Sequence, residues 1–379
     1  MSAASSSITE KLINNILEWA TELKHSAREF AKLPSSDQAQ VWNDLTGDEG
    51  RRRQFGIDGK EYLARLYEPD DMVEKALKDL DDEILKLPSD QKRALEMAIK
   101  MSKDYVGYNF HLKFLRAEKF DAHLAAVRMA LHFEEKLELF GEEKLVKEIS
   151  QSDLDDDDMA SLTSGYLQVL NSLDLGDRRV IFYYKALSNI DEVDCYKHRE
   201  NILRSFWYVM NVISRSEDVQ KLGVVNVVYN LGGMPHKGMD YEKSRRLAKL
   251  FKAIPVRFCS FYPCIDTKFW SVVVKTFSVI INKFLLLRFK IIKGDHEEVM
   301  LKLKAVGIPS ETLPVTDDSK LLKDDHLKWL AELKMVEEAE ALEPPSKRSR
   351  SEREPKIGDI DPDLISGLCK SSSSYYTVG

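Results

Sequence analysis

The titratable and nucleophilic residues of this chain do not fall into a catalytic pattern. The 8 histidines form no HExxH motif and no close pair, so they do not indicate a zinc centre. The 4 cysteines are scattered without a CxxC pair, which argues against a zinc site and against a dense disulfide framework. The chain also lacks a GxSxG nucleophile elbow and a GxxxxGK phosphate loop. We therefore expect no enzymatic activity, no catalytic residue and no bound metal.

One acidic run has a spacing that resembles a calcium loop. It extends from Asp153 to Asp158. The sixth position of the loop is Asp158 where a glycine is needed, and the twelfth is Ser164 where a bidentate glutamate is needed. We interpret the run as a solvated linker or a helix cap.

A long apolar segment in the C-terminal third of the chain is a candidate for contact with lipid. Residues Phe269 to Ile292 read FWSVVVKTFSVIINKFLLLRFKII, long enough to cross a bilayer. Each Lys or Arg near the centre of a span would cost about 2.5–3.5 kcal/mol. The segment is therefore predicted not to span a membrane, but to be buried or to meet a lipid surface. The residues that interrupt it are Lys275, Asn282, Lys283, Arg288 and Lys290.

The composition and net charge of the chain limit the kinds of molecule that it is expected to bind. The chain has 379 residues and is 43% hydrophobic, enough for a substantial core. It has 56 basic and 63 acidic side chains, a formal charge of −7, which argues against nucleic-acid binding through overall charge. Residues Met1 to Thr9 lack the basic start and apolar run of a secretory signal. We expect a cytoplasmic monomer with no nucleic-acid partner.

The first part of the chain has helical periodicity throughout. Apolar spacing predicts a first helix, and the phrase from Leu33 to Gln38 starts another. Phe120 and Asp121 are expected to form a turn and a helix cap within the last stretch. The helical segments are Ile8–Phe30, Met72–Leu85, Arg93–Tyr105 and Tyr108–Lys147.

After Gly165 short β-rich runs alternate with helical segments. This alternation predicts an α/β fold with a mixed, mostly parallel sheet. The run GVVNVVY is nearly all apolar, as expected of a strand covered on both faces. The expected strands are Tyr166–Leu170, Arg179–Lys185, Gly223–Tyr229, Val256–Tyr262 and Phe289–Ile292, and the expected helices are Glu200–Ile213, Tyr241–Ala253, Asp295–Val306 and an amphipathic Leu321–Leu342.

The run FLRAEKFDAHLAAVRMALHFEEK, Phe114 to Lys136, resembles the N-terminal helical signature of the CRAL-TRIO family. That family includes yeast-type phosphatidylinositol transfer proteins, the tocopherol transfer protein and the retinaldehyde-binding protein. The resemblance covers roughly residues 90 to 318. The further segments follow in the family's order, namely Asp177–Tyr183, Val225–Gly233, Arg257–Pro263, Thr267–Lys290 and Leu303–Pro314.

The chain departs from the family pattern at three places. Asn230 replaces the acid of the usual Asp-Leu-x-Gly, and Val315 to Asp318 stand where a Gly-Gly often follows the closing Leu-Pro. The position of a glutamate found in many phosphatidylinositol-binding members falls near Phe251 to Ala253. These departures put recognition of an inositol headgroup in doubt.

The resemblance implies non-enzymatic binding and transfer, or presentation, of a hydrophobic ligand such as a phospholipid in a gated cavity, with transient membrane contact and no other cofactor. The gate corresponds to Thr267–Leu287; the alternative is an ordinary core helix packed on the sheet. The side chains expected to contact the lipid are Phe269, Trp270, Val273, Val274, Phe277, Ile280, Ile281, Phe284 and Leu285 from the gate, and Val225, Val227, Phe258, Phe182 and Tyr184 from the strands.

The resemblance also implies headgroup or membrane contacts for some basic residues. Lys275, Lys283 and Arg288 are expected to meet anionic headgroups, each contributing about 1 kcal/mol near the surface. Lys290 is expected to contact a phosphate. Arg116 is expected to position either the helical lobe or the headgroup. The alternative for Lys290 and Arg116 is an ordinary surface ion pair of little energetic value.

These segments divide the chain as follows: a helical extension at 1–88, a CRAL-TRIO helical lobe at 89–150, the lipid-binding domain at 160–318, a C-terminal amphipathic helix at 319–342 and a disordered tail at 343–379. The basic cluster at 347–353 is either a nuclear import signal, a weak patch for anionic membranes or part of a solvated tail. An alternative function is a regulatory or scaffold protein that binds protein partners through its N-terminal helices and tail.

Overall fold

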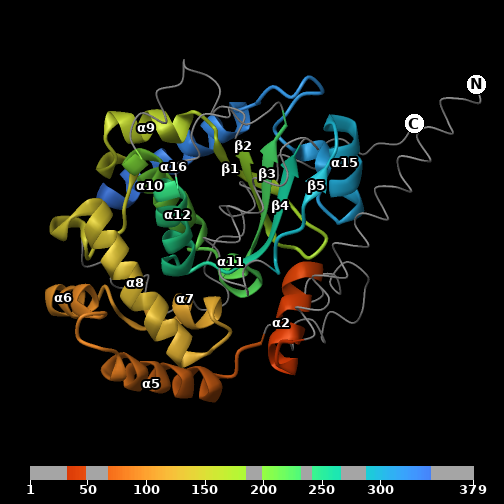
Figure 1. Cartoon of the computed structure of the whole chain (residues 1–379). Coiled ribbons are helices and arrows are strands. Elements are labelled where there is room, and N and C mark those ends of the chain that lie inside the picture. The colour runs from red at the N-terminus through yellow and green to blue at the C-terminus, as the bar shows by residue number, and fades with distance from the viewer. Residues whose placement is uncertain (1–31, 48–66, 185–198, 232–240, 266–286, 343–379) are drawn as a thin grey trace, which may run out of the picture.

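The computed structural model describes residues 32–47, 67–184, 199–231, 241–265 and 287–342. The expected helix Ile8–Phe30, the gate residues 267–286 and the tail 343–379 lie outside the described residues. The described part is an α/β structure with a five-stranded mixed sheet, flanked by helices and preceded by a helical lobe (Figure 1). The predicted α/β class is confirmed.

The sheet has its strands in sequence order, β1-β2-β3-β4-β5. The first pair is antiparallel, and the other neighbours are parallel. The final pair is short, and Phe289 adds only an isolated bridge to Phe261. The strands are β1 Leu167–Leu173, β2 Arg179–Tyr184, β3 Val224–Asn230, β4 Phe258–Ile265 and β5 Ile292–Lys293.

The two faces of the sheet are covered by different parts of the chain. Crossovers that are right-handed and always step in the same direction place their helices on one face. Accordingly, Phe206 of α10 (Arg199–Ile213) and Phe251 of α12 (Tyr241–Ala253) both contact Phe258 of β4. Helix α15 (His296–Ala305) lies on the opposite face (Figure 1). Its His296 contacts Tyr229 of β3. The short α11 (Glu217–Leu222) completes the first crossover.

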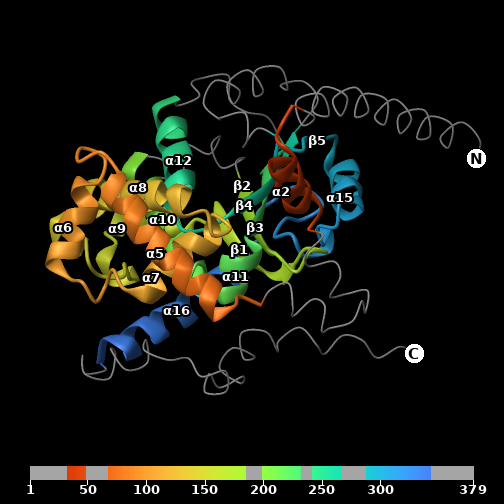
Figure 2. The ribbon, with the colours of Figure 1, turned by 90° about the horizontal axis from the view of Figure 1, so that it is seen from below.

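The helical lobe has its own apolar core. It comprises α5 (Asp70–Lys86), α6 (Arg93–Met101), α7 (Tyr108–Ala117) and α8 (Ala122–Phe140), which lie together on one side of the molecule (Figure 2). Helix α5 precedes the predicted boundary at residue 88, yet it packs into the same core as α7 and α8. The predicted cap at Asp121 is confirmed, because its side chain accepts a hydrogen bond from the Leu124 amide. The most buried core residues include Leu80, Leu95, Phe114, Leu115 and Phe133.

The acidic run forms a helix cap, as one of its two interpretations predicted. Asp155 and Asp158 form a reciprocal capping box at the start of α9 (Asp156–Thr163). The Asp158 carboxylate is buried and accepts hydrogen bonds from Arg204 and Asn201. The neighbouring short 3-10 helices are Glu142–Lys144 and Gln151–Asp153.

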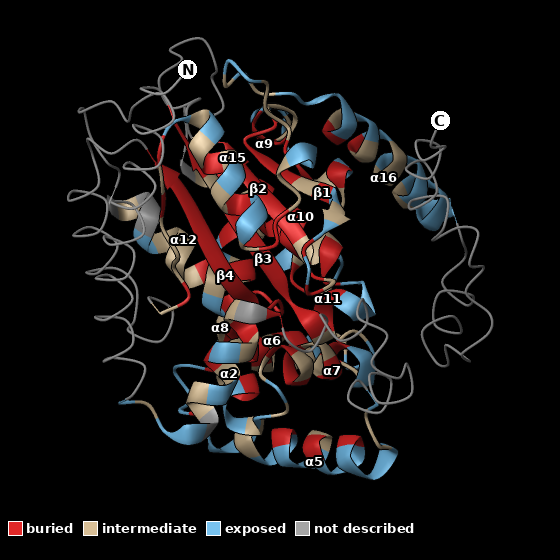
Figure 3. Cartoon of the chain, turned by 90° about the vertical axis from the view of Figure 1, so that its right-hand side faces the viewer, coloured by how far each residue is buried: buried red, intermediate tan, exposed pale blue. Residues whose placement is uncertain are grey.

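Helix α16 (Asp324–Leu342) attaches to the body by a few contacts and leaves most of its surface exposed (Figure 3). Leu330 and His326 are its buried residues. Glu337 accepts hydrogen bonds from the Gln151 amide and from the Tyr208 hydroxyl. Burial, with the nearby Glu337 carboxylate, raises the Tyr208 pKa. A 3-10 helix at Ser310–Thr312 precedes this segment.

Among the described residues, no helix combines the length and apolar character needed to cross a membrane.

Replacing Asp158 by alanine should lower the free energy of unfolding by about 2–3 kcal/mol, because buried donors of Arg204 and Asn201 lose their acceptor and α9 loses part of its cap. Urea unfolding measures this change. The matched control is Asp156→Ala, an exposed acid in the same helical turn, which should change stability little. Added calcium should not shift the midpoint of the wild-type protein; a clear calcium-dependent shift would contradict the cap interpretation.

Candidate ligand-binding face of the sheet

The structure tests only part of the predicted lipid site. The gate residues and two of the predicted cationic residues lie outside the described residues: Phe269, Trp270, Val273, Val274, Phe277, Ile280, Ile281, Phe284, Leu285, Lys275 and Lys283. The predicted strand residues and the other cationic residues are described.

The predicted strand residues do not share one face of the sheet. Strand pairing places Phe182 beside Val227 and Tyr184 beside Tyr229. Because side chains alternate along a strand, Val225 and Val227 share the face of Tyr229, which α15 covers. All of these side chains are buried.

Phe258 lies on the opposite face, beneath the crossover helices. Its ring packs edge-on against Phe251 of α12, with ring centroids 4.7 Å apart. It also stacks near Phe206 of α10 and Phe261 of β4, at 6.4 and 6.1 Å. Phe289 stacks on Phe261 at 4.6 Å. We call these five residues the aromatic cluster; of them, the sequence prediction included only Phe258.

The carboxyl end of β3 brings a polar group to the same face as the aromatic cluster. Register pairs Asn226 with Phe261, and alternation then places Val228 and Asn230 on that face. Asn230 is 9% exposed, and its side-chain oxygen Oδ1 is buried without a hydrogen-bond partner among the described residues. Val228 is only partly buried. A buried acceptor without a donor at the carboxyl edge of a parallel sheet is a candidate ligand contact, because this edge is where α/β sheets bind ligands.

Asn226 lies on the same face of β3, four residues before Asn230, but its side chain has hydrogen-bond partners within the protein. Its Oδ1 accepts a hydrogen bond from the Tyr183 hydroxyl at 3.1 Å, and its Nδ2 donates to the Ser260 carbonyl at 3.1 Å. Burial raises the pKa of Tyr183, so this hydroxyl stays a donor. Asn226 is therefore satisfied within the protein, which makes a structural role sufficient for it.

The α15 face is closed by the chain itself at the same edge. The Tyr184 hydroxyl donates to the Ser319 carbonyl at 2.7 Å. The Tyr229 hydroxyl lies 2.8 Å from both Nδ1 of His296 and the Ser319 hydroxyl. The rings of Tyr184 and Tyr229 stack with an interplanar angle of 9°. The four predicted residues on this face, Phe182, Tyr184, Val225 and Val227, therefore pack against protein.

Two of the predicted cationic contacts have internal partners instead. Arg288 is 3% exposed and donates to Asp44 of α2 (Ser35–Thr46), which corrects its expected place at a membrane surface. Arg116 pairs with Glu68 at 2.6 Å and donates to Gln220 of α11 at 2.7 Å. This geometry fits the expected role in positioning the helical lobe, not a headgroup contact. The ammonium of Lys290 lies 6.0 Å from the centre of the Tyr262 ring.

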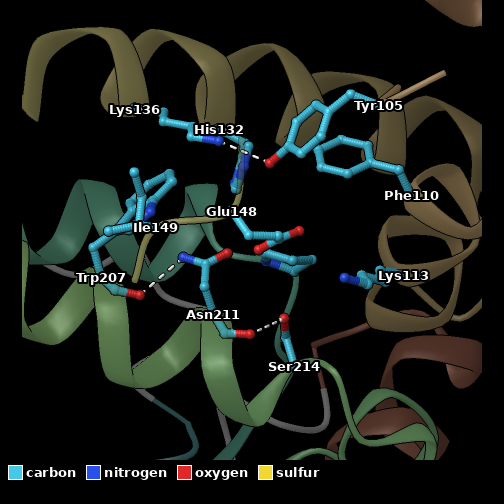
Figure 4. Close-up of a pocket in the computed structure, with 11 residues that line it drawn as sticks. Tyr105, Phe110, Lys113, His132, Lys136, Glu148, Ile149, Trp207, Asn211 and Ser214 are labelled. Carbon is cyan, nitrogen blue, oxygen red and sulfur yellow. Dashed lines mark hydrogen bonds between the residues drawn. The ribbon is translucent and has the colours of Figure 1, made fainter. Parts of the chain in front are cut away.

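A polar joint connects the helical lobe to α10 (Figure 4). Lys136 of α8 donates to the Tyr105 hydroxyl at 2.7 Å and to the Lys147 carbonyl at 2.6 Å. Burial lowers the Lys136 pKa to about 8. His132 packs on Trp207 with ring centroids 4.6 Å apart, and burial holds its pKa well below the ordinary value. The space between these side chains suits about one water molecule, so we interpret it as a structural joint.

The described residues contain no group of three or more His, Cys, Asp or Glu side chains arranged to hold a metal ion. A comparison of the chain with protein-family models and with curated proteins returned no match.

Acidification should destabilise the protein through its buried histidines. Burial lowers the pKa of both His132 and His326 in the folded state, so the unfolded chain binds more protons below its ordinary histidine pKa of about 6.5. Stability should therefore fall as the pH drops from 7.5 to 5.5, by up to about 1.4 kcal/mol per pH unit for each histidine. Urea unfolding across this range, on wild type and His132→Phe, measures the slope, which the substitution should reduce. His123→Phe, at a mostly exposed histidine, is the control, and an equal slope in all three proteins would contradict the assignment.

Proposed function

We propose that this chain binds one hydrophobic molecule, a lipid, without covalent chemistry, on the face of the sheet covered by α10 and α12. The observation that carries the proposal is the carboxyl end of β3, where Asn230 lies beside the partly buried Val228 and presents a buried acceptor that no described residue pairs with. The aromatic cluster lies further along the same face. An apolar wall with one placed polar group is the usual composition of a small-molecule site.

The topology supports the choice of face. The connection from β4 to β5 contains most of the apolar segment FWSVVVKTFSVIINKFLLLRFKII, and β5 is parallel to β4. The helices of the two earlier crossovers, α10 and α12, lie on the face of the aromatic cluster. We therefore propose that face for the ligand, and not the face of α15.

The resemblance to CRAL-TRIO proteins also supports a lipid ligand. Its two-helix signature corresponds to α7 and α8, joined at Phe120 and capped by Asp121. The strand segments that carry the resemblance correspond to β2, β3 and β4 in the order that the family has. The proposed ligand is therefore a lipid, with phospholipids the first class to test.

The proposed site performs solvation and not catalysis. Each methylene transferred from water to an apolar site contributes about 0.8 kcal/mol, so a lipid with two chains needs a dry surface along most of its length. We infer that Phe251 and Phe289, the partly buried members of the aromatic cluster, supply the accessible part of such a surface together with Val228. Asn230 Oδ1 offers an acceptor to a hydroxyl or ammonium group of the ligand, which would restore the hydrogen bond that burial removed.

Native mass spectrometry of the purified full-length protein, together with organic extraction, should show a co-purified lipid. A transfer assay between phosphatidylcholine vesicles, with and without phosphatidylinositol, then measures lipid exchange between the vesicles. The comparison also tests whether the protein recognises an inositol headgroup. Repeated purification without any lipid, combined with no uptake from either kind of vesicle, would rule the function out.

The substitution Val228→Trp should reduce lipid uptake about tenfold, because overfilling a packed site costs about 1–3 kcal/mol and 1.4 kcal/mol corresponds to a factor of ten. The same change at the exposed Val336 of α16 is the matched control and should leave uptake unchanged. Circular dichroism checks that both variants are folded. Equal uptake by folded Val228→Trp and wild type would place the ligand elsewhere.

A further inference from the structure

A buried cluster of charges lies beneath α2, at the amino-terminal ends of the parallel strands. Three arginines converge on Asp44: Arg178 next to β2, Arg257 next to β4 and Arg288 ahead of β5. Arg288 donates from both Nε and Nη2 to Asp44 Oδ2, at 3.1 and 2.5 Å. Arg257 Nε lies 3.4 Å from Asp44 Oδ1, and Arg178 Nη1 donates to the Asp44 carbonyl.

This cluster is almost fully withdrawn from solvent. Asp44 is 2% exposed, and the three arginines are between 3% and 7% exposed. Arg178 is also held by Asp174, whose Oδ2 accepts from its Nε and Nη2. Arg178 therefore has its position fixed by the β1–β2 turn, independently of α2. The three arginines therefore belong to segments next to the strands, whereas Asp44 belongs to α2 in the N-terminal extension.

The end of α2 fits this cationic surface closely. Its last turn contains no basic residue, so its carboxyl end presents carbonyl oxygens and the Asp44 carboxylate to the arginines. Gly47 follows with φ of 62° and lies against Gly176, where an added Cβ on either residue would be 2.8 Å from the other's Cα. Helix α2 contacts β4, Arg288 and this turn, and it lies on the other side of the molecule from α6 (Figure 2).

We propose that Arg178, Arg257 and Arg288 form an oxyanion-binding socket that Asp44 occupies in cis and that a phosphate group occupies when α2 is displaced. Guanidinium groups bind carboxylate and phosphate oxygens with the same forked geometry, so both anions suit the same three donors. Because Asp44 and phosphate need the same donors, they exclude each other. The socket lies at the amino-terminal ends of the strands, whereas Asn230 of the proposed lipid site lies at the carboxyl end of β3.

Isothermal titration of inorganic phosphate into the full-length protein tests the socket. Asp44→Ala should bind phosphate about tenfold more tightly than wild type, and Asp44→Ala/Arg288→Gln should lose that gain. Asp37→Ala, which removes the same charge from the first turn of α2, is the matched control and should behave as wild type. Titrations in chloride of equal ionic strength separate specific binding from screening. A folded Asp44→Ala protein that gains affinity neither in this titration nor for vesicles that contain a lipid phosphate overturns the proposal.

Vesicle binding distinguishes the two sources of the phosphate group. Phosphatidylcholine vesicles with phosphatidic acid, compared with phosphatidylcholine alone, report a lipid phosphate, and the titration reports a free one. Selective gain by Asp44→Ala in either arm supports the socket, and a gain in neither overturns it.

If Asp44→Ala does not fold, Asp44→Asn keeps the shape of the side chain without its charge and should still gain phosphate affinity. If neither variant folds, hydrogen exchange on wild type decides the question. Phosphate, but not chloride, should then accelerate exchange of the α2 amides between Val41 and Thr46, and unchanged exchange overturns the proposal.

Discussion

The order and direction of the strands determine which parts of the chain can meet. Because β2, β3 and β4 are parallel and adjacent in sequence order, the helices of the connections between them, α10 and α12, lie over the same face. The other face is left for the chain after β5, and α15 with the residues around Ser319 occupies it. The first face thus receives the aromatic cluster and Asn230, whereas the second receives a set of tyrosines whose hydroxyls are paired within the protein.

Buried charges help to join the helical lobe to α12, the helix that packs on the sheet. Arg128 of α8 donates to the carbonyls of Phe251 and Ile254 at the end of α12, at 3.1 and 2.7 Å. Lys249 of α12 pairs with the buried Glu135 of α8 at 2.6 Å, and burial raises the Glu135 pKa. Such pairs add little net stability when compared with apolar packing, but breaking one is costly. They therefore fix the position of the lobe relative to α12 more than they stabilise the fold.

The sequence was sufficient to predict most of the elements, but not α9 or α11, the bounds of β5, or the face and partner of each side chain. Helical spacing located α5, α10, α12 and α15 within a few residues, and the Phe120–Asp121 turn and cap are confirmed. The parity of β3 could not be predicted, because a strand buried on both faces has no alternation of polar and apolar residues. Phe182, Tyr184, Val225 and Val227 were consequently grouped with Phe258, although they point to the opposite face.

Arg288 shows a second limit of sequence reasoning. It follows an apolar run and so resembled a cation at the edge of a membrane-facing segment. Its partner Asp44 is 244 residues away in the chain, and no local pattern reports a contact of that separation. The signal that was available is the arginine at the start of each of several strands, Arg178, Arg257 and Arg288, which would have been meaningful only once the parallel pairing was known.

Arg288 also connects α2 to the edge of the sheet at β4. Its side chain is held by Asp44, while its carbonyl accepts a hydrogen bond from the Phe261 amide at 2.9 Å. Lys290 then donates its amide to the Phe261 carbonyl at 2.8 Å. The pairing of β5 with β4 proper covers only Cys264–Ile292 and Ile265–Lys293, so these two hydrogen bonds carry much of the connection there. The edge of the aromatic cluster is therefore held in place partly by a residue whose side chain is anchored to α2, and the position of α2 and the shape of the proposed ligand face share one physical support.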